Sequence, residues 1–589
     1  MNLSPEKRIA GVLAPLFALR GEDDLGIGDV AALREFIDWA AEIGFKLVQL
    51  LPINETGGDN SPYNAISATA IEPTTLHLAP GSPKDLTRQD FDIAVADVDL
   101  AQYRQGSVKY RRVKKLKRRL LEKAFSNFSA NAAEDRQSEF KKFCLEEATW
   151  LNNYTFFRAL MEQNRDSEAW DKWRTEHRTI KNACEWLRHL SQDRQRSRRE
   201  PSDVDGQPEG SPSGQRGDQS AFVARQNFFR YVQWIGHEQW REMKSYAAQR
   251  GVALMGDIPF GVSYYSADVF ARPNEFALDW SGGAPPELHF KDDEFTQKWG
   301  QNWGIPLYRW EAMRGNNFEW WRQRVRGVKR TFHLFRIDHV LGFYRIYAFP
   351  WRPTRNKEFL PLDWNDMLAR TEGRAPHFVP RDDSTLENCE ANRREGEEYL
   401  RVVLEESGST CVIGEDLGTV PDYVRPNLLS LGIAGFTIPQ WEVHHERVTP
   451  GSEYERLSVA TYATHDHKPL RKLWEEAVEH ATSTSDQTRH ELNKIAEFAQ
   501  FQPASESINF GKDFHPAIME ALFKCESWIA VVMLTDLLRL KYRFNVPGTA
   551  ASANWTRRMQ RTIGQLRSSR KERERMRLIR ELLEKTGRI

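Results

Sequence analysis

The sequence predicts an α/β protein built on a (β/α)8 TIM-type barrel with a large inserted helical subdomain. Short apolar runs alternate with longer stretches of helical period through most of the 589 residues, as they do where helices cover parallel strands. Eight such runs are present, which is the number of strands that the barrel requires. They are residues 11–17, 46–53, 252–258, 333–339, 411–416, 434–440, 459–465 and 530–535.

A doubly wound open sheet is the competing fold for the same alternation. A glycine-rich phosphate-binding loop after the first strand would favour that fold, and neither GxGxxG nor GxxxxGK[ST] is present there. The stretch that follows has helical period instead, with Leu33, Phe36 and Ile37 on one face. We therefore expect a helix over residues 30–43 that packs on the barrel.

The first predicted strand has an alternative interpretation. Lys7 and Arg8 precede an apolar run at residues 9–19, which has the length of a signal-peptide core. We favour a buried parallel strand over residues 11–17 that opens the fold. No run reaches the roughly 18 apolar residues that a membrane span needs, so no membrane-spanning helix is expected.

One long stretch interrupts the alternation of strands and helices. Residues 101–221 are predicted to form the inserted helical subdomain, which leaves residues 1–100 and 222–589 for the catalytic barrel and its extra helices. Within the insertion, residues 191–220 contain Val204 as their only aliphatic residue. Such a segment buries too little apolar surface to order itself, which predicts a mobile loop.

Three further stretches are unusual in composition. Residues 109–123 are strongly basic, with Leu116 and Leu120 at helical spacing; a contact with nucleic acid or lipid is one interpretation, and a solvated face on an amphipathic helix is the favoured one. Residues 352–408 form an unusually polar connection between two predicted strands. A C-terminal amphipathic helical pattern is formed by Ile563, Leu566, Met576, Ile579 and Leu583.

Composition narrows the classes of function. The 83 Lys and Arg residues balance the 83 Asp and Glu residues, so no basic excess indicates a nucleic acid or an acidic membrane as partner. The five cysteines are scattered without a CxxC pair, which argues against a disulfide framework or zinc knuckle and fits a cytoplasmic location. The 19 Trp, 32 Phe and 16 Tyr residues suit a core, and Trp faces also suit sugar rings.

Four of the predicted strands end in an acidic segment. In a (β/α)8 barrel the reactive residues lie at these C-terminal strand ends. A single acidic residue there is ordinary, because Asp favours turns and helix caps, but four indicate a site. The segments are Gly256-Asp257-Ile258-Pro259, Arg336-Ile337-Asp338-His339, Gly414-Glu415-Asp416-Leu417-Gly418 and Thr464-His465-Asp466-His467.

Two of these carboxylates have a pattern typical of glycosyl transfer. Arg336 and Asp338 are two residues apart, so on a strand they share a face, and the guanidinium favours the charged carboxylate that a nucleophile requires. Glu415 ends the next predicted strand, where neighbouring negative charge and a dry pocket would raise its pKa and make it a proton donor. Two carboxyls with separated pKa values are the apparatus of retaining glycosyl transfer. Taken singly, a structural Asp338–Arg336 pair, a helix-capping Glu415 and a turn-forming Asp466 are the alternatives.

Motifs that span nearly the whole chain carry a resemblance to a known family. The chain resembles the amylomaltase or disproportionating-enzyme family, the 4-α-glucanotransferases of the wider α-amylase clan. The motifs are LGIGD at 25–29, SPYN at 61–64, GDIPF at 256–260, SADVFARP at 266–273, PLYRW at 306–310, RIDHVLGF at 336–343, GEDLG at 414–418, THD at 464–466 and NVPGT at 545–549. The match at the start of the chain supports an opening strand there.

The resemblance implies a role for each matching residue. It implies three catalytic carboxylates, namely Asp338 as nucleophile, Glu415 as general acid/base and Asp466 as transition-state stabiliser. It also implies substrate-binding residues, namely Arg336, His465, Asp257, Ser61, Tyr63, Asn302 and Trp303. Ser61 and Tyr63 match the donor side of the site, Asp257 its floor, and the loop at Asn302 and Trp303 the border of the bound glucan.

The implied activity is a transfer of α-1,4-glucan segments. A segment of one malto-oligosaccharide, starch or glycogen chain would pass to the 4-hydroxyl of another by a retaining double displacement, with glucose released from short donors. The implied partners are malto-oligosaccharides, amylose or glycogen-type glucans, with no metal, cofactor, nucleic acid or membrane. The sequence predicts no particular oligomeric state.

Four departures from the family pattern border the expected glucan groove. After THD the chain continues His467-Lys468-Pro469, where the family usually has Asn-Asp-Thr, and Ile305 replaces a common Asn. The loop at residues 286–301 is longer and more charged than usual, and residues 352–408 exceed the usual connection. None removes a catalytic residue, so these differences bear on chain-length preference and on the balance of transfer to hydrolysis.

Three alternative functions fit parts of the same pattern. His465-Asp466-His467 is an HxH that, on a strand, would place two imidazoles on one face as in a metal hydrolase, with His339 as a further ligand. An α-glucan hydrolase would use the same carboxylates with water as acceptor. A non-catalytic glucan-binding protein would be indicated by loss of a catalytic carboxylate, and all three are present.

Overall fold

Eight parallel strands form a barrel at the centre of the protein. The computed structural model describes residues 3–197, 219–286, 293–479, 486–502, 508–547 and 552–589, and its largest sheet has the order β10-β13-β14-β1-β2-β3-β6-β9. An isolated parallel bridge between Ile413 and Ala434 joins the two edges, so the sheet is nearly closed. The barrel strands are β1 (Ile9–Leu13), β2 (Leu47–Gln49), β3 (Ala253–Pro259), β6 (Leu334–Asp338), β9 (Cys411–Gly414), β10 (Gly435–Thr437), β13 (Ser458–Ala460) and β14 (Ile529–Met533).

The predicted TIM-type barrel is therefore confirmed, and each predicted apolar run overlaps one of its strands. The run for which a signal-peptide core was the alternative supplies β1, which pairs with β14 on one side and β2 on the other. Several strands end earlier than predicted. β13, for example, ends at Ala460, so His465 and Asp466 lie on the loop that follows it.

Helix α1 (Val30–Ile43) has the predicted bounds because its ends are capped. The Asp29 side chain accepts hydrogen bonds from the backbone N–H groups of Ala31 and Ala32, and Gly44 ends the helix with a φ of 110°. Other helices close to the barrel are α12 (Glu319–Thr331), α15 (Leu386–Ser407), α16 (Val424–Ser430), α17 (Leu470–Trp474), α18 (Asp486–Phe498), α19 (His515–Lys524), α20 (Leu534–Leu537), α21 (Ile563–Ser568) and α22 (Arg570–Lys585).

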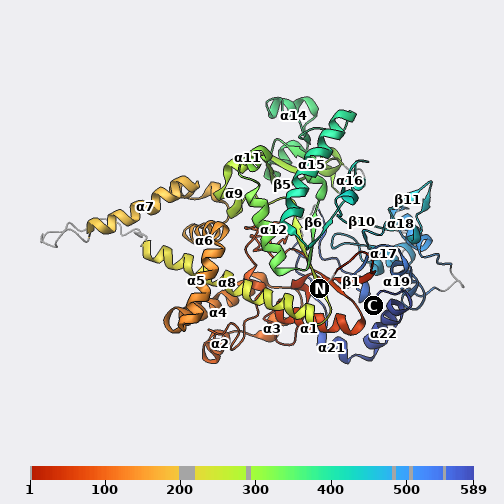
Figure 1. Cartoon of the computed structure of the whole chain (residues 1–589), viewed down its shortest axis with the longest axis horizontal. Helices are drawn as coiled ribbons and strands as arrows, with labels where there is room; N and C mark the ends of the chain where they lie inside the picture. The colour runs from red at the N-terminus through yellow and green to blue at the C-terminus, as the bar shows by residue number, and fades with distance from the viewer. Residues whose placement is uncertain (1–2, 198–218, 287–292, 480–485, 503–507, 548–551) are drawn as a thin grey trace.

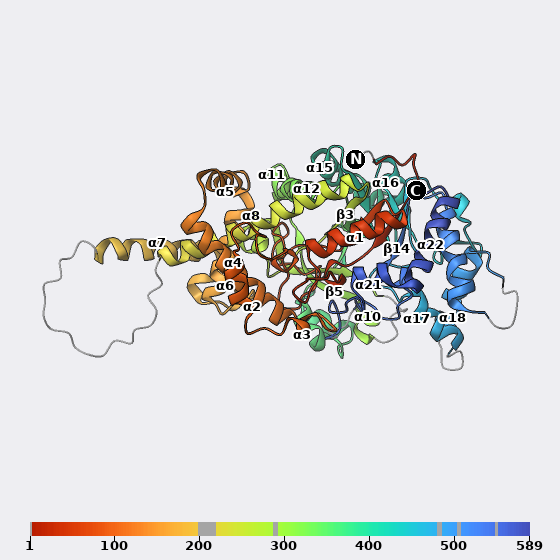
Figure 2. The ribbon, with the colours of Figure 1, turned by 90° about the horizontal axis from the view of Figure 1, so that it is seen from below.

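The helices between β2 and β3 gather at one end of the molecule, while α17, α18 and α22 lie at the opposite end (Figures 1 and 2). The helices between β2 and β3 are α2 (Arg88–Val95), α3 (Leu100–Arg104), α4 (Tyr110–Asn131), α5 (Glu134–Glu146), α6 (Ala148–Gln163), α7 (Ile180–Ser197) and α8 (Gln219–Gln249). Helix α8 packs on α6 and also on α1, so it crosses the domain boundary expected after residue 221. Of the loop expected over residues 191–220, the first seven residues continue α7 and residues 198–218 lie outside the described residues.

A second sheet, which the sequence did not predict, stands beside the barrel. It is antiparallel, with the order β5-β4-β7-β8, and comes from the segments between β3 and β6 and between β6 and β9. Its strands are β4 (Phe276–Ala284), β5 (Gln301–Tyr308), β7 (Ile346–Phe349) and β8 (His377–Val379), and the helices near it are α9 (Ala267–Ala271), α10 (Glu294–Lys298), α11 (Trp310–Gly315), α13 (Asn356–Phe359) and α14 (Trp364–Arg370). The polar connection 352–408 therefore consists largely of β8 and three helices.

The basic helix α4 has one lysine that is not solvated. Lys117 is 1% exposed and donates hydrogen bonds of 2.6 Å to the backbone oxygens of Thr74 and Leu76. Its Nζ also lies 3.4 Å from the buried carboxylate of Asp29, the N-cap of α1. Lys117 thus ties the inserted helices to the barrel. No helix in the described part of the chain has the length and apolarity needed to cross a membrane.

Replacing Lys117 with Ala is expected to lower the free energy of unfolding by about 3 kcal/mol. The change leaves the Asp29 carboxylate and two backbone oxygens buried without their cation, which is the costly way to break a buried ion pair. Urea unfolding monitored by circular dichroism measures the loss. Lys115→Ala, at an exposed position of the same helix, serves as the control and should change stability by less than about 0.5 kcal/mol. Equal stabilities of the two variants would contradict the assigned role.

Candidate active site

The guanidinium of Arg336 joins carboxylates from three neighbouring strands. Its Nη1 lies 2.5 Å from Oδ2 of Asp257, at the end of β3. Its Nη2 lies 2.6 Å from Oδ1 of Asp338, the last residue of β6, and 4.0 Å from Oε2 of Glu415, just beyond β9. The parallel register of β3, β6 and β9 produces this arrangement, since their C-terminal ends meet at one rim of the barrel.

Burial separates the two aspartates that Arg336 binds. The side chain of Asp257 is fully buried, whereas that of Asp338 is 29% exposed. Burial raises the pKa of Asp257, and the charge of Arg336 opposes that shift. Asp338 is therefore the carboxylate of this pair that a substrate can reach, with the positive charge of Arg336 directly behind it.

Glu415 has the environment of a proton donor. Burial raises its pKa to about 8, although the nearby Arg336 opposes the shift. The backbone N–H of His339 donates a 2.7 Å hydrogen bond to Oε2 of Glu415. His339 has a φ of +52°, a left-handed conformation that is unusual for this residue type and turns its N–H toward the glutamate.

Asp466 is held ionised on the loop that follows β13. Burial alone would raise its pKa, but His465, whose Nε2 lies 3.2 Å from Oδ2, keeps the pKa well below its usual range. Asn545 reinforces this by donating a 2.6 Å hydrogen bond to Oδ1 of Asp466. Arg543 donates to the backbone oxygen of the same residue. The pKa values of Glu415 and Asp466 are thus shifted in opposite directions.

Tyr63 connects the Asp466 side of the site to the Arg336 side. Its hydroxyl donates a 2.7 Å hydrogen bond to Oδ2 of Asp257, and its ring stacks on His465 with a centroid separation of 4.9 Å. Ser61 lies on the same loop, and its Oγ accepts a hydrogen bond from the backbone N–H of Tyr63. The Tyr63 hydroxyl also lies 3.5 Å from Nδ1 of His465, so the three predicted catalytic carboxylates belong to one continuous polar network.

Asn302 and Trp303, on β5 of the second sheet, occupy different positions. The indole of Trp303 is 38% exposed and packs edge-on against His339 at 4.7 Å, so it borders the site. The amide of Asn302 is instead engaged inside the second sheet. It accepts a hydrogen bond from the Ser281 hydroxyl and donates one to the backbone oxygen of Trp351. Asn302 thus positions β5, and its side chain is already occupied by protein partners.

Sequence reasoning gave no role to three residues that shape the site. Asn545 and Arg543 fix Asp466 from a segment 79 and 77 positions along the chain, and only the NVPGT motif marked Asn545. Asp416 is 1% exposed and accepts a 2.6 Å hydrogen bond from the backbone N–H of Phe436, which joins β10 to the strand end that carries Glu415. The sequence shows only two adjacent acidic residues, Glu415 and Asp416, and does not indicate that the second is buried.

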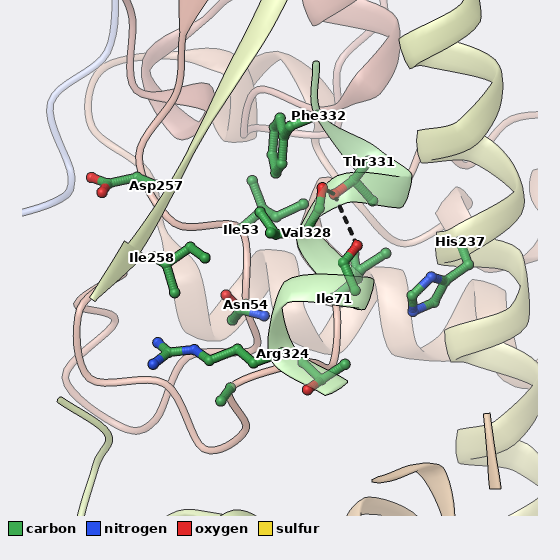
Figure 3. A pocket seen from close by; sticks show the side chains of 13 residues that line it. Ile53, Asn54, Ile71, His237, Asp257, Ile258, Arg324, Val328, Thr331 and Phe332 are labelled. Atoms are coloured by element: carbon green, nitrogen blue, oxygen red, sulfur yellow. Dashed lines mark hydrogen bonds between the residues drawn. The ribbon is translucent and has the colours of Figure 1, made fainter. Parts of the chain in front are cut away.

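A small cavity behind Asp257 is separate from this site. Its volume is about 30 Å³, close to that of one water molecule and far below that of a sugar ring. Figure 3 shows the Asp257 carboxylate pointing away from the other labelled side chains, which include Asn54 and Arg324. Arg324 itself donates to the backbone oxygen of Pro259. The cavity therefore lies on the outer side of β3, and Asp257 separates it from the carboxylate network.

The two histidines of the metal-hydrolase alternative do not share the face of a strand. His465 and His467 lie on a loop and not on a strand, and Nδ1 of His467 accepts a hydrogen bond from the backbone N–H of Thr464. Nε2 of His465 faces Asp466. Over the six described stretches of chain, no group of three or more His, Cys, Asp or Glu side chains is arranged to hold a metal ion.

Comparisons with known proteins find one family along most of the chain. A family model described as 4-alpha-glucanotransferase matches residues 14–201 and 214–563. The 4-alpha-glucanotransferase of Chlamydia caviae is 28% identical over 573 residues, which cover 94% of this chain and 91% of the relative. That of Synechocystis sp. is 25% identical over 558 residues, covering 93% of each chain.

Solved structures show the same fold. The amylomaltase of Streptococcus agalactiae, solved in complex with acarbose, superposes with a TM-score of 0.70 at 21% identity, covering 99% of this chain and 100% of the other. That of Corynebacterium glutamicum gives a TM-score of 0.72 at 19% identity, covering 99% of this chain and 76% of the other. At these identities the likeness to the solved structures shows the fold alone.

Proposed function

The chain belongs to the 4-α-glucanotransferase family, and on this premise we propose that Asp338, Glu415 and Asp466 transfer α-1,4-glucan segments between malto-oligosaccharide, amylose or glycogen-type chains. One observation carries the proposal. Arg336 contacts Asp338 and Glu415, and Asp257, Tyr63 and His465 continue these contacts to Asp466, so the three carboxylates share one network at the rim of the barrel. Five segments that are remote in sequence supply this network, namely those of Tyr63, Asp257, Arg336 with Asp338, Glu415, and His465 with Asp466.

The first step of the proposed reaction forms a glycosyl-enzyme. The carboxylate of Asp338 attacks the anomeric carbon, and the C–O bond to the leaving glucan breaks as protonated Glu415 gives its proton to the departing oxygen. Arg336 stabilises the negative charge of Asp338 before the attack. A pKa of about 8 keeps Glu415 protonated at neutral pH, as this step requires.

The second step reverses the roles. Glu415, now a carboxylate, takes the proton from the 4-hydroxyl of an acceptor glucan, whose oxygen attacks the anomeric carbon and releases Asp338. Two inversions at the same carbon give net retention. Asp466 accepts hydrogen bonds from ring hydroxyls, and these contacts strengthen as the ring flattens toward an oxocarbenium ion, which is how binding energy lowers the barrier.

Hydrolysis of α-glucans is the competing outcome of the same first step, with water in place of the acceptor. Incubation with maltotriose separates the two. We expect a ladder of longer malto-oligosaccharides together with free glucose, resolved by high-performance anion-exchange chromatography. Shortening of maltotriose to maltose and glucose without longer products would identify a hydrolase and contradict the proposal.

We further propose that the enzyme acts in the cytoplasm. All five cysteines are free, and a reducing compartment keeps thiols in that state. The non-catalytic glucan-binding alternative has no specific support, because Asp338 and Glu415 are both present, and their environments suit a nucleophile and a proton donor.

A further inference from the structure

An exposed tryptophan stands beside the loop that carries Asp466. Trp441 follows β10, and its side chain is 48% exposed although it is one of the largest apolar groups in the protein. Its ring packs on the imidazole of His467 with a centroid separation of 5.0 Å and an interplanar angle of 56°. The pair leaves part of an aromatic face open to solvent next to a residue of the carboxylate network.

The imidazole of His467 has a defined proton position. Its Nδ1 accepts a hydrogen bond of 3.0 Å from the backbone N–H of Thr464, so the proton of the neutral ring is on Nε2. Burial lowers the pKa of His467 to about 4, so the ring is neutral near pH 7. The N–H at Nε2 has no hydrogen-bond acceptor among the described residues, so within that part of the chain it is a donor of fixed position that a ligand can use.

The strand order places this pair on the acceptor side of the proposed reaction. Glu415 follows β9, Trp441 follows β10 and His467 follows β13, and these three strands are consecutive around the barrel. A general acid lies beside the leaving-group oxygen, whose place the acceptor later takes. Tyr63, which matches a donor-side residue, belongs to the loop after β2 on the other side of Asp466.

We propose that Trp441 and His467 form a binding site for a glucose unit of the acceptor glucan. The indole covers the apolar face of the sugar, and Nε2–H of His467 donates to one of its hydroxyls. This inference rests on the proposed function and deepens it, because an occupied acceptor site excludes the water that would otherwise hydrolyse the glycosyl-enzyme. It also gives a role to His467, which stands where the family usually has Asn.

Acceptor kinetics test the proposal. With saturating maltotriose as donor and ¹⁴C-glucose as varied acceptor, we expect Trp441→Ala and His467→Asn each to raise the acceptor KM about tenfold and to increase the ratio of hydrolysis to transfer. Tenfold corresponds to the loss of about 1.4 kcal/mol, the magnitude of one good hydrogen bond or aromatic contact. Trp364→Ala removes a similarly exposed tryptophan from α14 and is the control that leaves this KM unchanged.

Two histidine variants separate binding from local structure. In His467→Asn the new amide oxygen can still accept the hydrogen bond from Thr464, but only the longer side chain of His467→Gln brings an N–H near the position of Nε2. We therefore expect His467→Gln to recover part of the acceptor affinity that His467→Asn loses. An acceptor KM within twofold of wild type in both Trp441→Ala and His467→Asn would overturn the proposal.

A binding measurement distinguishes failure of this inference from failure of the proposed function. If the wild-type enzyme forms no transfer products at all, the proposed function is wrong. Isothermal titration of maltose into Asp338→Asn protein, with and without Trp441→Ala, then tests the site without turnover. A Kd raised about tenfold by Trp441→Ala supports the sugar site, and an unchanged Kd rejects it.

Discussion

Asp338→Asn is expected to lower kcat for glucan transfer by about 10⁴-fold or more. The amide has almost the same shape as the carboxylate but cannot form the covalent bond to the anomeric carbon, and loss of a covalent nucleophile typically has an effect of this order. Initial rates of glucose release from maltotriose measure the loss. Glucose is released from maltotriose whether a glucan or water is the acceptor, so the assay measures the loss of both transfer and hydrolysis.

The control for this prediction is Asp366→Asn on α14, an exposed aspartate outside the carboxylate network. It should keep the wild-type rate. Urea unfolding of Asp338→Asn checks that the variant is folded. We expect it to fold, because Arg336 retains Asp257 as its partner at 2.5 Å. A folded Asp338→Asn variant with a rate within tenfold of wild type would show that another group attacks the sugar.

Glu415→Gln is expected to lower kcat by 10²- to 10⁴-fold, on the order of what a general acid contributes. Gln cannot donate a proton to the leaving oxygen, although it can keep the hydrogen bond from the backbone N–H of His339. The loss should be largest for maltotriose, whose alkoxide leaving group needs protonation. It should be much smaller for the first step with a glucosyl fluoride, because fluoride leaves without an acid.

The pH dependence gives a second signature of the same residue. Glu415 must be protonated in the free enzyme, and its pKa is raised to about 8, so kcat/KM for maltotriose should fall as the pH rises through about 8. Glu415→Gln should lose this alkaline limb, because the amide does not titrate. An alkaline limb of unchanged position in the variant would assign the titration to another group.

The barrel could be predicted from sequence because each of its strands and helices is marked by a short pattern of neighbouring residues. Each strand is a short apolar run, and helix α1 is bounded by Asp29 and Gly44, whose capping preferences are properties of the residues themselves. The acidic residues of the site lie at the ends of predicted strands, so the sequence identified them directly. Arg336 and Asp338, two residues apart on one strand, form the pair that their spacing predicted.

The parts that were not predicted depend on contacts between remote segments. Strand β4 contains Gly282 and Gly283 and shifts register against β5, so it lacks the alternation that marks a strand. The burial of Lys117 depends on Asp29, which is 88 positions away. Asn302 matched a family position, but its amide is used by Trp351. Such roles depend on contacts between segments that are far apart in the sequence, so no single stretch of sequence reveals them.

Trapping the covalent intermediate tests the central claim most directly. Glu415→Gln enzyme treated with α-maltosyl fluoride should accumulate a glycosyl-enzyme, since the fluoride departs without the acid while deglycosylation lacks its base. Peptide mass spectrometry after acid quenching and proteolysis is then expected to find one maltosyl unit on the peptide that contains Asp338, attached to that residue. A maltosyl unit on a different residue, or turnover of the fluoride with inversion at the anomeric carbon, would contradict the account.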